Sequence, residues 1–233
     1  MLYALSGFIF GLLIPYMARR FAKFMPATAA YAVYRLVWPV KRVSKAKRSQ
    51  SAQYKKLMDK YRMRSIGWGI VCAALSYLAY LSFPAIAGWF MPLIWILLLL
   101  YEIDERILLL PDVLTVPLLI LGFAFSAMAL PDSGYYPIMS ALGALAGYIL
   151  PIIATLFLIK KHPDAFGGGD IKLLAAVGAW LGLAMVPYVI LISCIVFALF
   201  SLAKRQRAGA FGPAIVIATL ILVFFGRQFI MYL

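Results

Sequence analysis

The sequence predicts an all-α, polytopic helical membrane protein, and three observations support this fold class. Hydrophobic residues make up 65% of the 233 residues and charged residues only 13%, so a soluble domain would lack the polar residues to cover its surface. The hydrophobic residues gather in runs close to the roughly 20 residues that a helix needs to cross the hydrocarbon layer. These runs do not alternate with a period of two, which disfavours the strands of a membrane barrel.

The apolar runs predict about eight transmembrane helices. They are Leu2–Ala18, Ile66–Ser82, Ala85–Tyr101, Val113–Leu130, Tyr136–Ile159, Ile171–Met185, Pro187–Ala203 and Ala210–Phe225. The stretch from 171 to 203 is too long for one crossing, and Gly182 and Pro187 supply a break that divides it into two helices. The first run is followed by basic residues, the reverse of a secretory signal peptide, so we expect it to be retained.

Basic residues predict the orientation of these helices, because Lys and Arg concentrate on the cytoplasmic side of a membrane. Basic residues lie at the ends of the apolar runs that we place on the cytoplasmic side: Arg19, Arg64, Arg106, Lys160, Lys161, Lys172, Lys204, Arg205 and Arg207. Arg227 alone falls on the opposite side. We therefore expect both termini to lie outside the cytoplasm, an N-out/C-out topology.

One segment holds most of the 22 Lys and Arg residues, and hence most of the net charge of +14. It runs from Arg19 to Arg64 and contains a single acid, Asp59. A polybasic segment beside apolar helices is attracted to anionic lipid headgroups, so we expect lipids rather than nucleic acid as its partner. The predicted organisation is a first transmembrane helix (1–18), one large basic cytoplasmic loop (19–65) and a helical membrane core (66–233).

Five of the eight acids lie at two cytoplasmic turns, where an ionisable group beside the bilayer suggests function. They are Glu102, Asp104, Glu105 and Asp112 between the third and fourth runs, and Asp170 between the fifth and sixth. Taken singly, Asp170 is explained as a helix N-cap, and Asp104 as an interfacial charge paired with Arg106 or Lys172. Taken together, two carboxylates that share a proton activate water, one as base and one as acid.

Three glycines, Gly167, Gly168 and Gly169, directly precede Asp170. Without Cβ atoms, they allow a tight bend and leave room for an extended peptide backbone beside Asp170. This pattern favours a peptide as the molecule that meets the carboxylate.

The remaining residues that often carry chemistry have simpler explanations. The single histidine, His162, lies in the polar stretch KKHPD and is typical of a solvated loop, with no serine partner suggested. The two cysteines, Cys72 and Cys194, lie in separate apolar runs without CxxC spacing, which is typical of core residues. We therefore predict neither a metal site nor a disulfide.

Two stretches resemble the motifs of the type IV prepilin peptidases: GGGDIKLLAAVGAWLG resembles their GxGD region, and IDERILLLPDVLTVPLLILG their aspartate motif with a following PD element. The resemblance covers roughly residues 85–200. It implies an aspartic endopeptidase of the bacterial inner membrane that removes short basic leaders from prepilins or pseudopilins at the cytoplasmic face. It also implies Asp104 and Asp170 as the catalytic pair, with Gly167, Gly168, Gly169, Asp112 and Lys172 positioning substrate or loop.

Many members of that family also carry a cytoplasmic domain with paired CxxC motifs, associated with methylating the new N-terminus from S-adenosylmethionine. Residues 19–64 contain no cysteine. The resemblance therefore implies no cofactor for proteolysis, argues against a zinc site, and leaves methylation with S-adenosylmethionine open.

Two hypotheses from other functional classes remain. A proton- or ion-coupled transporter subunit would use Asp104 and Asp170 as a relay, but it predicts acids near the bilayer midplane rather than at the ends of helices. A non-catalytic subunit of a pilus or secretion assembly would use Asp170 only as a cap. Cleavage of a prepilin-like peptide by the purified protein, with no other component, separates both from the peptidase.

Overall fold

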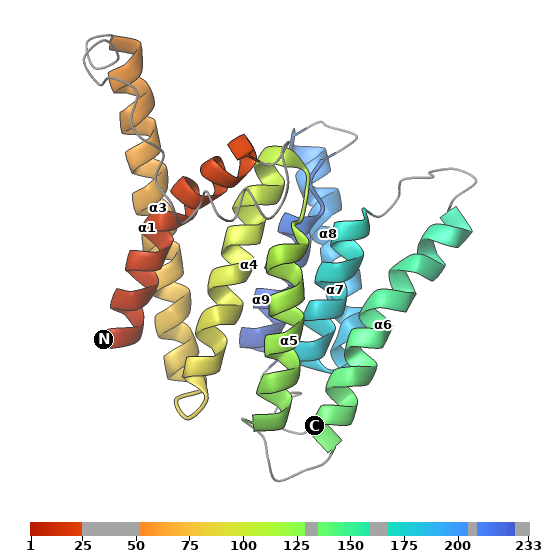
Figure 1. Ribbon diagram of the computed structural model, residues 1–233. Helices are drawn as coiled ribbons and strands as arrows, with labels where there is room; N and C mark the ends of the chain where they lie inside the picture. The colour runs from red at the N-terminus through yellow and green to blue at the C-terminus, as the bar shows by residue number, and fades with distance from the viewer. Residues whose placement is uncertain (25–51, 129–134, 159–166, 205–208, 227–233) are drawn as a thin grey trace. The chain divides into compact units, whose positions relative to one another are not determined.

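The computed structural model describes residues 1–24, 52–128, 135–158, 167–204 and 209–226. Within these ranges the chain forms helices and no strand (Figure 1). The helices are α1 (Leu2–Phe24), α3 (Ala52–Ser82), α4 (Ala87–Ile107), α5 (Asp112–Met128), α6 (Tyr135–Leu158), α7 (Gly168–Leu181), the 3-10 turn η1 (Leu183–Met185), α8 (Val186–Lys204) and α9 (Gly212–Phe225). Each predicted apolar run lies largely within one α-helix, so the all-α class is confirmed.

Five segments of the described helices are long and apolar enough to cross a membrane. They are Leu2–Ala22, Asp59–Ser82, Ala87–Ile107, Tyr136–Leu156 and Leu183–Ala203. The helices α5, α7 and α9 are shorter, with 17, 14 and 14 residues. At about 1.5 Å per residue, 14 residues extend only about 21 Å, less than the roughly 30 Å of hydrocarbon. The chain is a polytopic helical membrane protein, while eight crossings and the N-out/C-out topology stay predictions.

Both helices that border the predicted basic loop extend into it. Helix α1 continues through Arg19 to Phe24, and α3 already begins at Ala52 rather than at Ile66. Arg and Lys are good helix formers, and their long side chains reach water from a helix that has left the apolar layer. The end of an apolar run therefore marks the end of the hydrocarbon crossing and not the end of the helix. The other predicted loop residues, 25–51, lie outside the described ranges, as do Asp132, Lys160, Lys161, His162, Asp164, Arg205, Arg207 and Arg227.

The predicted break within residues 171–203 is confirmed, and it begins at Gly182. Helix α7 ends at Leu181, and Gly182 follows with a φ of 78°, a conformation that glycine adopts without steric cost. Its N–H donates a 2.8 Å hydrogen bond to the carbonyl oxygen of Gly178. Helix α8 then starts at Val186 and carries Pro187 in its first turn, where the missing proline N–H leaves no hydrogen bond unmade.

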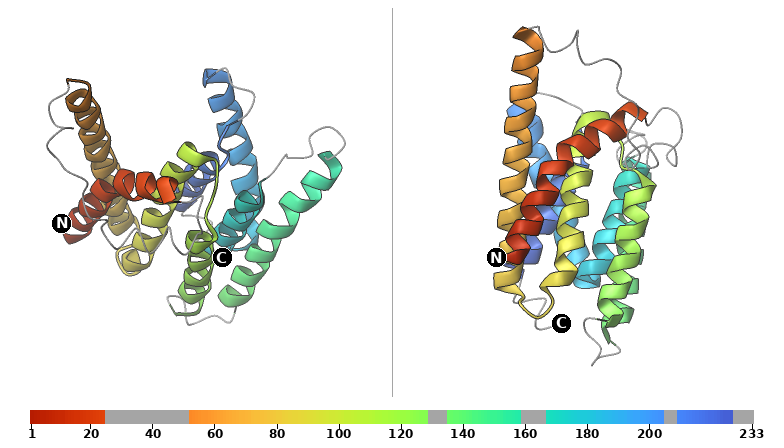
Figure 2. Two further views of the ribbon diagram at one scale, coloured as in Figure 1. Left: turned by 45° about the horizontal axis from the view of Figure 1, so that its top comes forward. Right: turned by 60° about the vertical axis from the view of Figure 1, so that its left-hand side comes forward.

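The chain divides into two compact units, residues 1–106 and 107–233. In the first unit, α1 packs along α3 and its C-terminal part turns away from α3 (Figure 2). Two glycines four residues apart on α1 allow this packing. A Cβ atom at Gly7 would lie 2.5 Å from Ser76 Oγ, and one at Gly11 would overlap the carbonyl oxygen of Trp68. The two backbones therefore touch, as is common between membrane helices.

In the second unit, α7 packs against both α5 and α6 (Figure 1). On the α6 side, a Cβ atom at Gly143 would overlap the carbonyl oxygen of Gly178, so the two backbones again touch. On the α5 side, the indole N–H of Trp180 donates a 2.9 Å hydrogen bond to the carbonyl oxygen of Leu118. Helix α7 is thus held on two sides.

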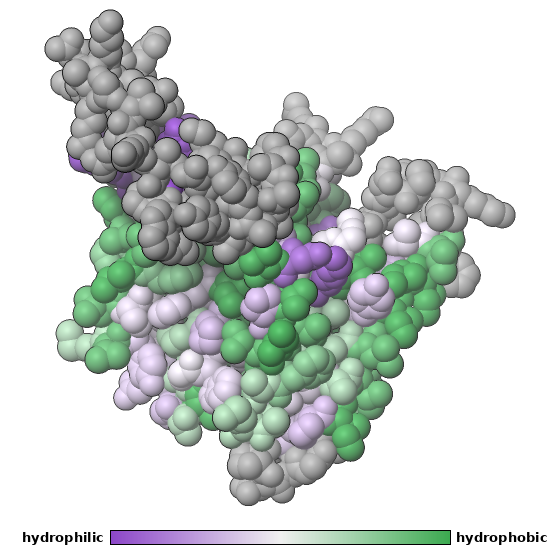
Figure 3. All heavy atoms as spheres, in the orientation of Figure 1, coloured by the Kyte–Doolittle hydropathy of each residue, from purple (hydrophilic) through white to green (hydrophobic). Residues whose placement is uncertain are grey.

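The surface of the second unit separates apolar from polar residues along its helices. Hydrophobic side chains cover the visible face of α6, and a small hydrophilic group lies near the ends of α5 and α7 (Figure 3). On α6 the exposed apolar residues include Ile138, Leu145, Ile149 and Leu156, from 39% to 62% exposed. Apolar side chains in these positions are those expected to face lipid.

Candidate active site

Asp170 lies in the first turn of α7, and it is not the N-cap. Gly167 is the N-cap, with φ −67° and ψ 145°, and Asp170 is the third helical residue. The N-cap reading of Asp170 is therefore wrong, because the extended glycine takes the capping position itself. The Asp170 carboxylate turns back toward that glycine, since a Cβ atom at Gly167 would lie 3.0 Å from Asp170 Oδ2. An acid in the first turn is stabilised by the positive end of the helix dipole.

The three glycines of the GxGD region have different surroundings. A Cβ atom at Gly168 would meet no heavy atom within 4 Å, and one at Gly167 would meet only the Asp170 carboxylate. At Gly169, by contrast, it would lie 2.8 Å from the Leu110 Cβ and 3.1 Å from the Leu110 carbonyl oxygen. The space next to Gly168 is therefore open, whereas the chain's own segment before α5 fills it at Gly169. Room for a substrate backbone stays a prediction.

Asp112 and Lys172 form an ion pair between the first turns of α5 and α7. Lys172 Nζ donates to both carboxylate oxygens of Asp112, at 2.8 and 2.7 Å. Both side chains are about half exposed, 44% and 58%, so the pair contributes little stability, roughly 0–1 kcal/mol. The described partner of Lys172 is Asp112. A pairing of Lys172 with Asp104, which belongs to the other unit, stays a prediction.

Asp104 lies near the C-terminal end of α4 and is only 4% exposed. It belongs to the first unit, whereas Asp170 belongs to the second. The pairing of these two carboxylates stays a prediction. The segment that follows α4 begins with Leu108, which has a positive φ of 53°, the usual conformation of glycine after a helix C-terminus.

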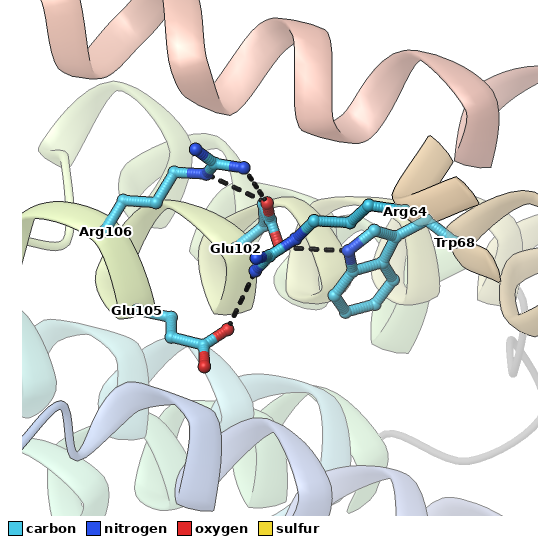
Figure 4. Close-up of polar contacts among 5 residues, drawn as sticks. All are labelled: Arg64, Trp68, Glu102, Glu105 and Arg106. Atoms are coloured by element: carbon cyan, nitrogen blue, oxygen red, sulfur yellow. Dashed lines mark hydrogen bonds and ion pairs between the residues drawn. The ribbon is translucent and has the colours of Figure 1, made fainter. Parts of the chain in front are cut away.

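Glu102, two residues before Asp104, is the centre of a polar network between α3 and α4 (Figure 4). Its side chain is 0% exposed. Arg106 donates to Oε1 through Nε at 2.9 Å and through a terminal nitrogen at 2.6 Å. Arg64, at 2.9 Å, and the indole of Trp68, at 2.9 Å, donate to Oε2. Arg64 also reaches Glu105 Oε2 at 3.1 Å.

This network corrects the predicted partner of Arg106 and adds Arg64 and Trp68, which the sequence did not single out as site residues. Arg106 pairs with Glu102, and not with Asp104, because residues four apart on a helix share a face whereas residues two apart do not. The spacing of Glu102 and Arg106 was a usable signal for that pair. The contributions of Arg64 and Trp68 from α3 leave no signal in the sequence, because they depend on how two helices pack.

Groups of three or more His, Cys, Asp or Glu side chains that could hold a metal ion are absent from the described residues. Both cysteines are free, and Cys72 is buried. Cys194 is exposed, so its prediction as a core residue is wrong. The physical reason is that lipid is as apolar as a protein core, so an apolar run does not reveal which of its side chains face inward.

Comparison with known proteins identifies relatives of the chain. Residues 91–202 match the type IV leader peptidase family. The chain is 36% identical over 169 residues to a prepilin leader peptidase/N-methyltransferase of Aeromonas salmonicida (strain A449), which covers 69% of the chain and 51% of the relative. The protein of that name in Neisseria gonorrhoeae is 30% identical over 168 residues, covering 70% of the chain and 57% of the relative.

A shorter relative is covered more fully. The prepilin leader peptidase/N-methyltransferase of Escherichia coli (strain K12) is 32% identical over 186 residues, covering 72% of the chain and 80% of the relative. The chain thus spans about half the length of the Aeromonas relative and four fifths of the E. coli one. No solved structure shows significant similarity to the chain.

Proposed function

The chain belongs to the type IV leader peptidase family, and we propose that it is an aspartic endopeptidase that removes the short basic leader from prepilins or pseudopilins. One observation carries the proposal: both acidic motifs, with Asp104 and Asp170, fall inside the segment that matches the family. The relatives' shared name, prepilin leader peptidase/N-methyltransferase, supports the substrate class.

Asp104 and Asp170 are the proposed catalytic pair and share one proton before the reaction. We assign the base to Asp170, because its place in the first turn of α7 favours the charged carboxylate. Asp170 takes a proton from water while the water oxygen attacks the scissile carbonyl carbon, and Asp104 gives its proton to the carbonyl oxygen. When the C–N bond breaks, Asp170 returns its proton to the leaving amine and Asp104 regains one from the intermediate.

The surroundings of Asp170 suit an extended peptide. The open side of Gly168 leaves space for a substrate backbone next to the carboxylate. On the other side, the contact of Gly169 with Leu110 and the ion pair of Asp112 with Lys172 link the first turns of α5 and α7. In this proposal Gly169, Asp112 and Lys172 position the loop, and Gly168 admits the substrate.

The proposed setting is the cytoplasmic face of a bacterial inner membrane. The basic residues at alternate helix ends favour this side, and the polybasic segment favours contact with anionic lipid. A prepilin leader is itself basic and is repelled by that segment, so the lipid has to neutralise the segment first. Proteolysis uses no cofactor in this proposal. Methylation of the new N-terminus with S-adenosylmethionine, the second activity in the relatives' name, stays open.

Cleavage by the purified protein tests the proposal. The detergent-solubilised chain is incubated with a short-leader prepilin and no other protein, and the products are identified by mass spectrometry. We expect release of the leader at one bond, and no loss of activity with metal chelators or with reagents for thiols or serines, since water is the attacking species. An uncleaved substrate would contradict the proposal and favour the non-catalytic assembly subunit. Inhibition by a chelator that zinc reverses would contradict the aspartic mechanism.

A further inference from the structure

The first unit contains a buried carboxylate that the proposed mechanism does not use. Glu102 is fully enclosed and lies two residues before Asp104 on the same helix. A charge in such a place is costly unless it is paired and hydrogen-bonded. We propose that Glu102 is a positioning residue, which fixes the direction in which α4 presents Asp104. This role rests on the proposed function.

The hydrogen bonds of Glu102 are complete. Each carboxylate oxygen accepts two donors: Oε1 from Arg106 twice, and Oε2 from Arg64 and Trp68. An ionised carboxylate has about four acceptor sites, so its capacity is filled. Two nitrogens of Arg106 donate to the same oxygen, Oε1, and such charge-assisted hydrogen bonds are stronger than neutral ones. Because all four hydrogen bonds converge on one carboxylate, rotation of α4 about its axis would break the network.

Helix geometry links this network to Asp104. Successive residues of an α-helix are about 100° apart, so residues 102 and 104 are about 200° apart and point to opposite sides of α4. The donors Arg64 and Trp68 come from α3. Glu102 therefore holds one face of α4 against α3, and Asp104 projects from the opposite face. A catalytic carboxylate gains from such anchoring, because a misplacement of about 1 Å can cost roughly 100-fold in rate.

The network also holds two positively charged guanidinium groups in place. Arg106 is two residues after Asp104, and its guanidinium is held on the Glu102 side of the helix. Arg64 is bound between Glu102 and Glu105. A neutral residue at position 102 would release both guanidinium groups from their main acceptor. Glu105 differs from Glu102 in the way a control requires: its side chain is 33% exposed, and Arg64 contacts it through one bond.

Steady-state kinetics of Glu102→Gln and Glu105→Gln test the inference. Glutamine keeps the size of Glu102 but replaces one acceptor oxygen with a donor, so it cannot satisfy four donors. We expect kcat per folded molecule to fall roughly 10- to 100-fold in Glu102→Gln, with KM nearly unchanged, because an interaction that orients a catalytic group acts in the transition state. Glu105→Gln should stay within about twofold of the parent in both constants. If Glu102→Gln yields too little folded protein, Arg106→Lys keeps the charge, loses one of the two hydrogen bonds to Oε1, and should lower kcat in the same direction.

A second readout does not depend on peptidase activity. Asp104→Cys is made in a chain that also carries Cys72→Ala and Cys194→Ala, and the rate of alkylation by a water-soluble thiol reagent is measured. We expect Glu102→Gln to change this rate severalfold and Glu105→Gln to leave it unchanged. Equal rates in both variants, or a full kcat in Glu102→Gln, would overturn the positioning role. Absence of cleavage by the parent chain, together with a Glu102-dependent alkylation rate, would instead overturn the proposed function.

Discussion

The two units hold their proposed catalytic carboxylates by different physical means. In the first unit, the end of α4 that carries Asp104 is fixed by a buried carboxylate with two arginines and an indole. In the second unit, the first turn of α7 that carries Asp170 is fixed by backbone contact at Gly169 and by an exposed ion pair. The end of α4 that carries Asp104 thus depends on charge, and the first turn of α7 that carries Asp170 depends mainly on the absence of side-chain atoms at Gly169.

The largest stability effect is expected from removing the buried carboxylate of Glu102. Glu102→Ala removes one partner of a buried network and should destabilise the protein by about 3 kcal/mol, since Arg106 loses its acceptor and Arg64 keeps only Glu105. Asp112→Ala removes one partner of an exposed pair and should cost at most about 1 kcal/mol. Unfolding of both variants by denaturant in the same micelles measures the difference. Similar losses in the two variants would show that the units do not differ in this way.

The second prediction concerns backbone contact. Gly143→Ala places a methyl group against the backbone of α7 and should destabilise the second unit by about 1–3 kcal/mol. Gly67→Ala on α3 is the matched control, because a Cβ atom there meets nothing within 4 Å, and it should stabilise the helix by roughly 0.5–1 kcal/mol. Thermal unfolding in detergent gives both values. A neutral Gly143→Ala would contradict the close approach of α6 and α7.

The glycines before Asp170 provide a finer test within the second unit. Gly169→Ala pushes its new methyl group into Leu110, which displaces the turn that carries Asp170, and should lower cleavage about tenfold. Gly168→Ala adds the same methyl group on the open side, where it narrows the space proposed for the substrate backbone but leaves the turn in place, so it should raise KM and lower cleavage at saturating substrate less than Gly169→Ala. The two variants are compared by initial rates of leader release. The opposite order of the two rates would show that Gly168, rather than Gly169, is the constrained position.

The smallest effect is expected at the junction after α4. Leu108 has a φ of 53°, which costs a residue with a Cβ atom roughly 1 kcal/mol relative to glycine. Its side chain is 68% exposed, so little packing is lost on removing it. Leu108→Gly should therefore leave stability unchanged or raise it by up to about 1 kcal/mol, as measured by denaturant unfolding. A clear loss of stability would show that the Leu108 side chain makes contacts that outweigh its backbone strain.

Much of the fold follows from the sequence, because backbone groups in lipid must bond within their own helix and long apolar runs therefore become helices. The break at Gly182 follows from the same length argument. Helix ends were harder to predict: α3 extends to Ala52 because charged residues favour a helix as well as a loop. The exposed position of Cys194 was missed because apolarity does not separate lipid-facing from buried residues.

The candidate site was predictable to a smaller extent. The motif residues Asp104, Asp112 and Asp170 stand out because acids beside apolar runs are rare. The place of Asp170 in the third position of α7 depends on which of four consecutive residues caps the helix, a choice that a glycine run leaves open. Apart from Arg106, the partners of Glu102 are 34 and 38 residues away from it, and the partner of Lys172 is 60 residues away, so only the packed structure reveals them.

Cleavage by three isosteric variants is the direct test of whether Asp104 and Asp170 act as a catalytic pair. Asp104→Asn, Asp170→Asn and the control Asp112→Asn are purified in detergent, checked for equal folding, and assayed with a short-leader prepilin. We expect each of the first two to abolish leader release, because either one removes half of a pair that must share a proton. We expect Asp112→Asn to stay active, since the amide oxygen still accepts from Lys172. Substantial cleavage by Asp104→Asn or by Asp170→Asn would contradict the paired mechanism.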